Sequence, residues 1–148
     1  MKTEDAMWLG LALTIMLVLL TDKASAAEYN YSIDTVNYSM HHAGNAKNEK
    51  HDGIGFSIIQ YQDDGDVYNY GYMRYRNSFG DMSHLLHGSK VIYRNSDIVV
   101  ALGVGAATGY EDHVSIPVAP FFSIKYGWVV FTHIPMSVTT VGLKVPVL

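Results

Sequence analysis

Short segments of alternating apolar and polar residues, separated by polar turns, fill the chain from residue 31 onward. A period of two residues is typical of β-strands, and no convincing amphipathic helix interrupts it. The pattern predicts eight strands, at 31–42, 53–61, 67–77, 84–94, 97–109, 117–125, 127–135 and 138–147. Such a series indicates an all-β fold, either an antiparallel barrel or a sandwich.

The segments between the predicted strands alternate in length. The sequences "QDDGD" (62–66) and "YRNSD" (93–97) predict tight hairpin turns, whereas 43–52 and 110–115 predict longer polar loops. Alternation of short turns and long loops is typical of outer-membrane barrels. We therefore expect an eight-stranded antiparallel outer-membrane β-barrel.

The predicted strand at 97–109 shows two faces of different composition. Its even positions from Ile98 to Ala106 are apolar, whereas its odd positions from Ala101 to Gly109 are all alanine or glycine. An apolar face toward lipid and a small-residue face toward the lumen explain both sets. The small residues would leave room for an acyl chain or for bulky side chains from across the lumen. A soluble sandwich also buries one face of each strand, so it stays open as an alternative.

The first residues predict export. Met7 to Leu20 form an uncharged apolar segment, and Ala24 and Ala26 supply the small residues of an A-x-A cleavage site. This predicts a signal peptide over residues 1–26, cleaved after Ala26, and one barrel domain over residues 27–148. The leading "MKTEDA" is acidic, unlike most signal peptides. An uncleaved anchor is the alternative, but the apolar segment is shorter than the roughly 20 residues needed to span a membrane.

Composition narrows the classes of partner. The 148-residue chain has no cysteine, so neither a disulfide framework nor a thiolate metal site can form. Its formal net charge is −4 and no basic run is present, which argues against nucleic acid as a partner. The 11 tyrosines suit the boundary between lipid and water, because each has an apolar ring and a polar hydroxyl. No motif requires a metal or another cofactor, and we expect a monomer.

Two long stretches resemble the lipid A palmitoyltransferases, which are eight-stranded outer-membrane barrels that move a palmitoyl chain from a phospholipid to lipopolysaccharide. They are "GIGFSIIQYQDDGDVYNYGYMRYRNSF" (53–79) and "LGVGAATGYEDHVSIPVAPFFSIKYGWVVFTHIP" (102–135). The resemblance covers residues 39–148 and is strongest at Gly53–Phe56, Asn77–Phe79, Ile116–Pro120 and Tyr126–Pro135. Shorter relatives, some carried by bacteriophages, also have Tyr-x-Asn-Ser. The resemblance implies the outer membrane as location, and phospholipid and lipopolysaccharide as partners.

The active residues proposed for that family are a histidine, an aspartate and the serine after it. The serine matches Ser78, Asn77 occupies the aspartate position, and the histidine matches His41, with His42 beside it. Acyl transfer through serine needs a base for its proton and a group that orients this base. A neutral Asn77 cannot stabilise the imidazolium, which implies a slow enzyme or none unless Asp81 folds back to substitute. The alternative is that Asn77 and Ser78 are hydrogen-bonding residues at a strand end.

Prolines suggest a second property of the family. Pro117, Pro120 and Pro135 lie in or beside predicted strands, where proline removes a hydrogen bond of the ladder. In the palmitoyltransferases similar prolines weaken strand pairing so that a lipid chain enters the barrel sideways. The resemblance implies such a lateral gate here, and a bulge or a strand edge is the alternative.

The strand directions predict where these groups meet. Strands 31–42 and 67–77 end at the same rim, so we expect His41 beside Ser78 despite their separation in the chain. Arg74 and Arg76 share parity with Ser78 and are expected at headgroup height, where arginine pairs with lipid phosphates.

Two functions of different class remain open from the sequence. The first is a phospholipid-dependent acyltransferase that acts on lipopolysaccharide, which the prolines favour. The second is a non-catalytic outer-membrane barrel with a binding or surface-modifying role, which Asn77 favours.

Overall fold

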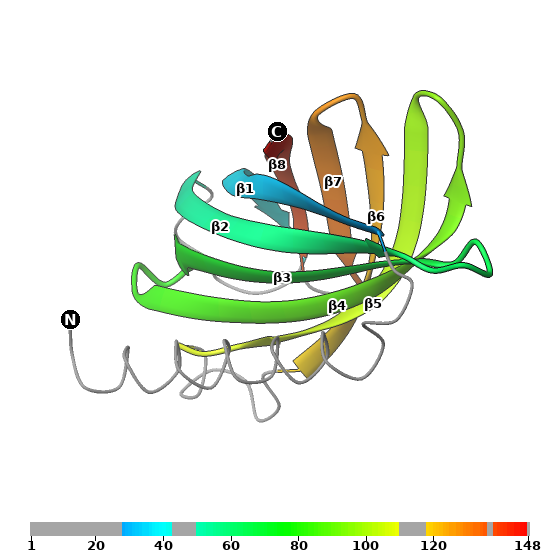
Figure 1. The fold of residues 1–148 in the computed structure, drawn as a ribbon. Helices are drawn as coiled ribbons and strands as arrows, with labels where there is room; N and C mark the ends of the chain where they lie inside the picture. The colour runs from blue at the N-terminus through cyan, green and yellow to red at the C-terminus, as the bar shows by residue number, and fades with distance from the viewer. Residues whose placement is uncertain (1–27, 43–49, 110–117, 136–137, 148) are drawn as a thin grey trace.

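The eight strands close into one antiparallel barrel (Figure 1). The computed structural model describes residues 28–42, 50–109, 118–135 and 138–147. The strands are β1 (Glu28–His41), β2 (Lys50–Tyr61), β3 (Val67–Arg76), β4 (Met82–Arg94), β5 (Ile98–Ala107), β6 (Val118–Tyr126), β7 (Val129–Ile134) and β8 (Val138–Val147). Each strand pairs with the next, and β8 pairs with β1. The predicted all-β barrel is confirmed, and two stacked sheets are excluded.

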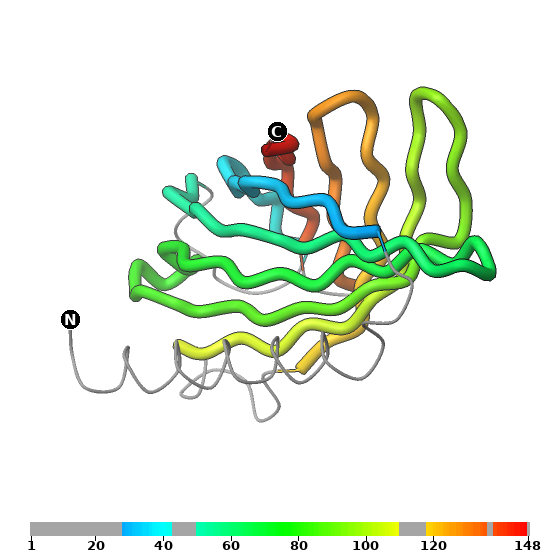
Figure 2. Tube along the Cα trace, in the orientation of Figure 1, coloured from blue at the N-terminus to red at the C-terminus, as the bar shows by residue number. Residues whose placement is uncertain are grey.

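The two ends of the barrel differ in the segments they carry. Turns 62–66, 95–97 and 127–128 lie at one end, together with the start of β1 and the finish of β8 (Figure 2). We call this the turn end, and we call the opposite end, where β1, β3, β5 and β7 finish, the loop end. Helices long and apolar enough to cross a membrane are absent from the described residues.

The barrel wall is apolar outside, while buried positions are mostly polar. Large side chains such as Ile54, Leu102 and Val104 are more than half exposed on the outer face, whereas Ser57 and Ser83 are buried. In β5, Leu102, Val104 and Ala106 point outward and Ala101 is buried, as the composition of its two faces predicted. This distribution is the inverse of the usual one in a soluble protein.

A buried ion pair crosses the seam where the barrel closes. Lys144 of β8 lies 3.1 Å from a carboxylate oxygen of Asp34 in β1. The same ammonium donates to Ser57 in β2 and, over 2.9 Å, to the side-chain carbonyl of Asn69 in β3. Ser57 donates a further hydrogen bond of 2.6 Å to Asp34. Every buried charge in this cluster therefore has a partner, as burial requires.

An aromatic ring and an imidazole fill the space that a side chain would occupy at two of the glycines, Gly71 and Gly103. A Cβ atom on Gly103 would collide with the ring of Phe121, and one on Gly71 would collide with the ring of His87. These two rings meet edge to face, with centroids 6.0 Å apart. Both rings come from the neighbouring strand, since Phe121 of β6 is paired with Gly103 and His87 of β4 is paired with Gly71. In β5, the glycine at 103 therefore makes room for a bulky side chain of the next strand.

Candidate functional site at the loop end

Asn77 organises the turn between β3 and β4. Its carbonyl oxygen accepts the backbone N–H groups of Phe79 and Asp81, both at 2.9 Å. Its amide nitrogen donates to the Ser83 hydroxyl over 3.0 Å and to the Gly109 carbonyl over 2.7 Å. The side chain is fully buried, and these bonds use both its donors and both its acceptor sites. Asn77 therefore ties the turn to β4 and to the end of β5.

The backbone of the same turn is also closed by hydrogen bonds. The N–H of Asn77 donates to the carbonyl of Asp81 over 2.7 Å, and the N–H of Gly80 donates to the carbonyl of Asn77 over 3.0 Å. Arg76 donates from its guanidinium to the Gly80 carbonyl over 2.9 Å. Gly80 has a φ of 97°, a conformation that glycine adopts without strain. Ser78 is held inside this closed turn.

The turn places the hydroxyl of Ser78 against the imidazole of His41. Ser78 Oγ and His41 Nε2 are 2.5 Å apart, although the residues are 37 positions apart in the chain. Ser78 is only 3% exposed. The neighbouring His42 does not share this position, since its Nε2 lies 2.7 Å from the Thr139 hydroxyl. His41, at the end of β1, is therefore the histidine that meets Ser78.

A change of phase in β1 turns His41 toward the lumen. Ser32 and Asp34, at even positions, are buried in the first half of β1, whereas Ser39 is buried in the second half. The register with β8 shifts between Asp34 and Tyr38, where β1 has one residue more than β8. The register with β2 shifts between Val36 and Tyr38, where β1 has one residue fewer than β2. A bulge of this kind re-aims the side chains that follow it. Without it, the inward side chains near the loop end would be those at even positions.

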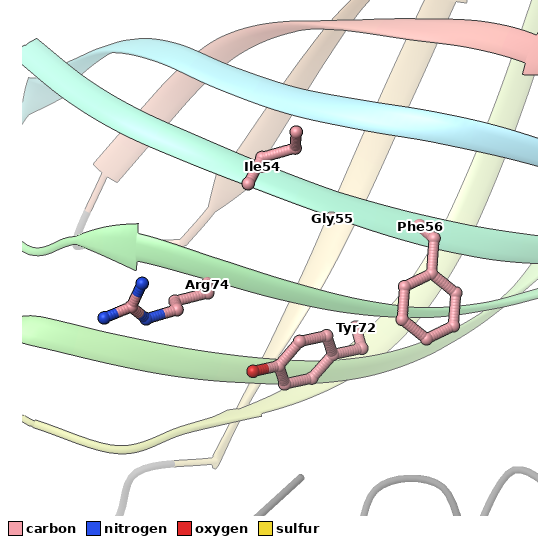
Figure 3. Close-up of a pocket in the computed structure, with 5 residues that line it drawn as sticks. All are labelled: Ile54, Gly55, Phe56, Tyr72 and Arg74. Atoms are coloured by element: carbon pink, nitrogen blue, oxygen red, sulfur yellow. The ribbon is translucent and has the colours of Figure 1, made fainter. Parts of the chain in front are cut away.

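Arg74 does not lie with Ser78, whereas Arg76 donates to the Gly80 carbonyl in the turn that holds Ser78. Arg74 is paired with Ile54, and both are exposed on the outer wall, whereas Ser78 faces the inward His41. The alternation of β3 ends at Arg76, so the shared parity does not extend into the turn. Arg74 borders a shallow outer hollow of about 290 Å³ (Figure 3). The remaining lining residues of this hollow are Ile54, Gly55, Phe56 and Tyr72.

The prolines lie where pairing between β6 and β7 stops. Pro120 sits opposite Val104 in an unbroken β5–β6 register, but β6–β7 pairing ends at Phe122 and His133. Pro135 follows β7 directly, and Pro117 lies outside the described residues. An outer hollow of about 300 Å³ lies beside this end of the pairing, lined by Phe122, Ile124, Phe131, His133 and Thr139. Interrupted pairing near the prolines was expected for a gate, and the gate itself stays a prediction.

Two residues near the site were not singled out from the sequence. His51, which we had assigned to a polar loop, lies in β2 and contacts Ser39 of β1. The sequence "KHDGIGF" (50–56) already shows that the strand begins before Gly53. His51, Gly53 and Gly55 alternate there with charged or larger residues, and this alternation extends back to Lys50. In a barrel with a polar interior, an inward histidine is compatible with a strand.

The site brings a serine hydroxyl against an imidazole, and the residue before the serine is a neutral amide. The Asp81 residue is exposed, and its carboxylate makes no hydrogen bond or ion pair with the described residues. Among the described residues, no group of three or more histidine, aspartate or glutamate side chains could hold a metal ion. Serine and histidine at this distance can perform nucleophilic acyl transfer with general-base assistance.

No model of a known protein family matches the chain, and no curated protein sequence matches it.

Proposed function

We propose that this protein is an outer-membrane lipid-handling barrel that transfers an acyl chain from a phospholipid to lipopolysaccharide. The observation that carries the proposal is the 2.5 Å contact between Ser78 Oγ and His41 Nε2 at the loop end. A serine nucleophile with a histidine base is the arrangement that acyl transfer needs. The resemblance to lipid A palmitoyltransferases supports the same reaction class.

The distribution of side chains supports a membrane location. The exposed outer residues include Leu102, Val104 and Phe131, and an exposed apolar surface of this extent suits lipid. Tyr93, Tyr126 and Trp128 are exposed at the turn end, as expected for the aromatic girdle of an outer-membrane barrel. The turn end carries the short turns, the start of β1 and the finish of β8, which matches the periplasmic side of such barrels. The loop end, with Ser78, would then face outward.

The chemistry would proceed in two acyl transfers. His41 Nε2 takes the proton of Ser78 as Oγ attacks the ester carbonyl of a phospholipid, and the proton then passes to the leaving lysophospholipid. A hydroxyl of lipopolysaccharide then attacks the acyl carbonyl and gives its proton to His41; the bond between the acyl carbon and Ser78 Oγ breaks, and His41 returns the proton to Oγ, which restores the free hydroxyl. The Asp-to-Asn change in a serine-protease triad costs about 10⁴ in turnover, so the neutral Asn77 makes a slow enzyme the expectation.

Two outer features support access by lipids. The end of β6–β7 pairing near Pro120 and Pro135 would let a chain enter sideways, because fewer hydrogen bonds hold the wall there. Arg74 is exposed beside an apolar hollow, a combination that suits a lipid phosphate next to its chains.

A non-catalytic barrel with a binding or surface-modifying role is the second candidate, and specific observations favour it. Asn77 has its amide fully engaged in the turn, and Ser78 is almost completely buried. Phe121 and His87 also occupy lumen space that an acyl chain would need. In this role Ser78 and His41 would be a structural hydrogen bond at the rim.

Mass spectrometry of lipid A separates the two candidates. Cells that express the intact chain should contain lipid A with one additional acyl chain, and Ser78→Ala should abolish it because no nucleophile remains. Ser89→Ala is the matched control, since Ser89 is also buried but lies on β4 away from the loop end. Full acylation in Ser78→Ala would leave the serine as no more than part of a turn.

A further inference from the structure

A second serine–histidine pair lies close to the first. His51 Nε2 is 2.6 Å from Ser39 Oγ, and His51 Nδ1 is 2.5 Å from the carbonyl oxygen of Arg76. Ser39 has no exposed surface and His51 is 6% exposed. The ring of His51 also packs edge-on against Tyr75, with centroids 6.0 Å apart. Because this pair is sealed from its surroundings, its effect must pass through the groups it holds.

The partners of His51 determine its tautomer. The Arg76 carbonyl can only accept a hydrogen bond, so His51 must carry its proton on Nδ1 and donate from there. In the neutral ring Nε2 then has a lone pair, and the Ser39 hydroxyl must donate to it. Each group therefore fixes the orientation of the next, from Ser39 through His51 to the backbone of Arg76.

This chain of bonds joins the two segments that carry Ser78 and His41. Ser39 is two residues before His41 on β1, and Arg76 is two residues before Ser78 at the end of β3. Strands β1 and β3 are not paired with each other, because β2 lies between them. His51 on β2 therefore links the end of the base-bearing strand to the end of the nucleophile-bearing strand.

We propose that Ser39 and His51 are positioning residues that set the hydroxyl of Ser78 against His41. The proposal rests on the proposed role of Ser78 as nucleophile. Its physical basis is that a displacement of about 1 Å in a reacting group can reduce rate by about 100-fold. Asn77 fixes the turn toward β4 and β5, and the Ser39–His51 pair fixes it toward β1.

The first test is which nitrogen of His51 carries a proton. Proton–nitrogen correlation spectra of the full chain, labelled at histidine and folded in detergent micelles, should show a proton on Nδ1 of His51. A ring protonated on Nε2 alone would overturn the proposal. The His41 nitrogen signals should move in Ser39→Ala and stay in place in Ser89→Ala.

The second test is the rate at which a fluorophosphonate probe labels Ser78, located by peptide mass spectrometry. Ser39→Ala and His51→Gln should slow labelling about 10- to 100-fold. His51→Asn should slow labelling as much as Ser39→Ala, because its amide nitrogen replaces Nδ1 and keeps the bond to Arg76 but no atom replaces Nε2 toward Ser39. Glutamine reaches the Nε2 position instead and loses the bond to Arg76, so each amide breaks one of the two bonds of His51. Ser89→Ala is the matched control and should stay within about threefold of the wild type.

The labelling results test the positioning role of Ser39 and His51 separately from the acyl transfer proposed for Ser78. Equal labelling in His51→Gln and the wild type, or labelling on Ser39, would overturn the positioning role. If Ser78 is not labelled in the wild type, the proposed acyl transfer fails instead. In that case the nitrogen signals of His41 and His51 still test the positioning role, because they depend on the hydrogen bonds from Ser39 to Arg76 and not on activity.

Discussion

The amide of Asn77 explains why an asparagine, and not an aspartate, precedes Ser78. The sequence predicts that Asn77→Asp leaves acylation unchanged or raises it, and this stays a prediction. The structure adds an expected loss of stability, because a carboxylate would direct an oxygen at the Gly109 carbonyl, which accepts a bond of 2.7 Å from the amide. Asn77→Asp should lower the free energy of unfolding by about 1–3 kcal/mol, the cost of losing one buried hydrogen bond. Urea unfolding of the protein in lipid vesicles would measure it.

Asn95 provides the matched control for this substitution. It accepts backbone N–H groups from Asp97 and Ile98, and its amide nitrogen donates to the Tyr93 hydroxyl over 3.0 Å. A tyrosine hydroxyl can donate as well as accept, so Asn95→Asp keeps every bond and should change stability by less than about 0.5 kcal/mol. Equal losses in both variants would contradict the role assigned to Asn77.

At the scale of single residues, the sequence predicted the Ser78–His41 contact but not the function of Asn77. The contact followed from strand directions, which fix which ends share a rim. Two of the four bonds of Asn77 depend on where Ser83 and Gly109 arrive from β4 and β5, and no local pattern encodes that. For the same reason, the sequence did not predict the hydrogen bond between His51 and the Arg76 carbonyl.

At the scale of elements, the bulge in β1 controls the height and the direction of His41. Deletion of Asn37 should remove the extra residue that β1 has relative to β8 and leave regular alternation along β1, with His41 still inward. Relative to β2, where β1 already has one residue fewer, the mismatch grows to two residues. The histidine would then lie about 3.3 Å lower along the strand, because one residue of rise is lost. We expect the deletion variant to retain its strand content by circular dichroism and to lose fluorophosphonate labelling of Ser78.

If the Asn37 deletion variant is labelled at the wild-type rate, the reactivity of Ser78 does not depend on His41. Sequence alternation identified β1 as a strand but did not predict which of its residues face inward. Since a bulge is stabilised by pairing with two neighbouring strands, the phase change at Val36–Tyr38 could not be read from one strand alone.

At the scale of the whole molecule, the barrel has apolar side chains outside and polar side chains inside, and this distribution supports the proposed membrane location. The alternation that predicted the barrel did not distinguish a soluble protein from a membrane protein. Closure of the sheet adds the missing information, because the inner face then holds Asp34 and Lys144 while the outer face holds the apolar residues. In water this outer face would be a continuous exposed apolar surface.

Charge placed on the outer wall tests that location. Val104 is 52% exposed near the middle of β5, and Tyr126 is 63% exposed at the turn end of β6. If lipid surrounds the wall, Val104→Arg should lower the free energy of unfolding in vesicles by about 2–4 kcal/mol, and Tyr126→Arg by at most about 1 kcal/mol. If water surrounds it, both substitutions should stay within about 0.5 kcal/mol of the wild type, as surface changes usually do. Two small and equal effects would therefore exclude the outer-membrane location, whereas a loss that is large at Val104 and small at Tyr126 requires a hydrocarbon layer whose depth matches the barrel.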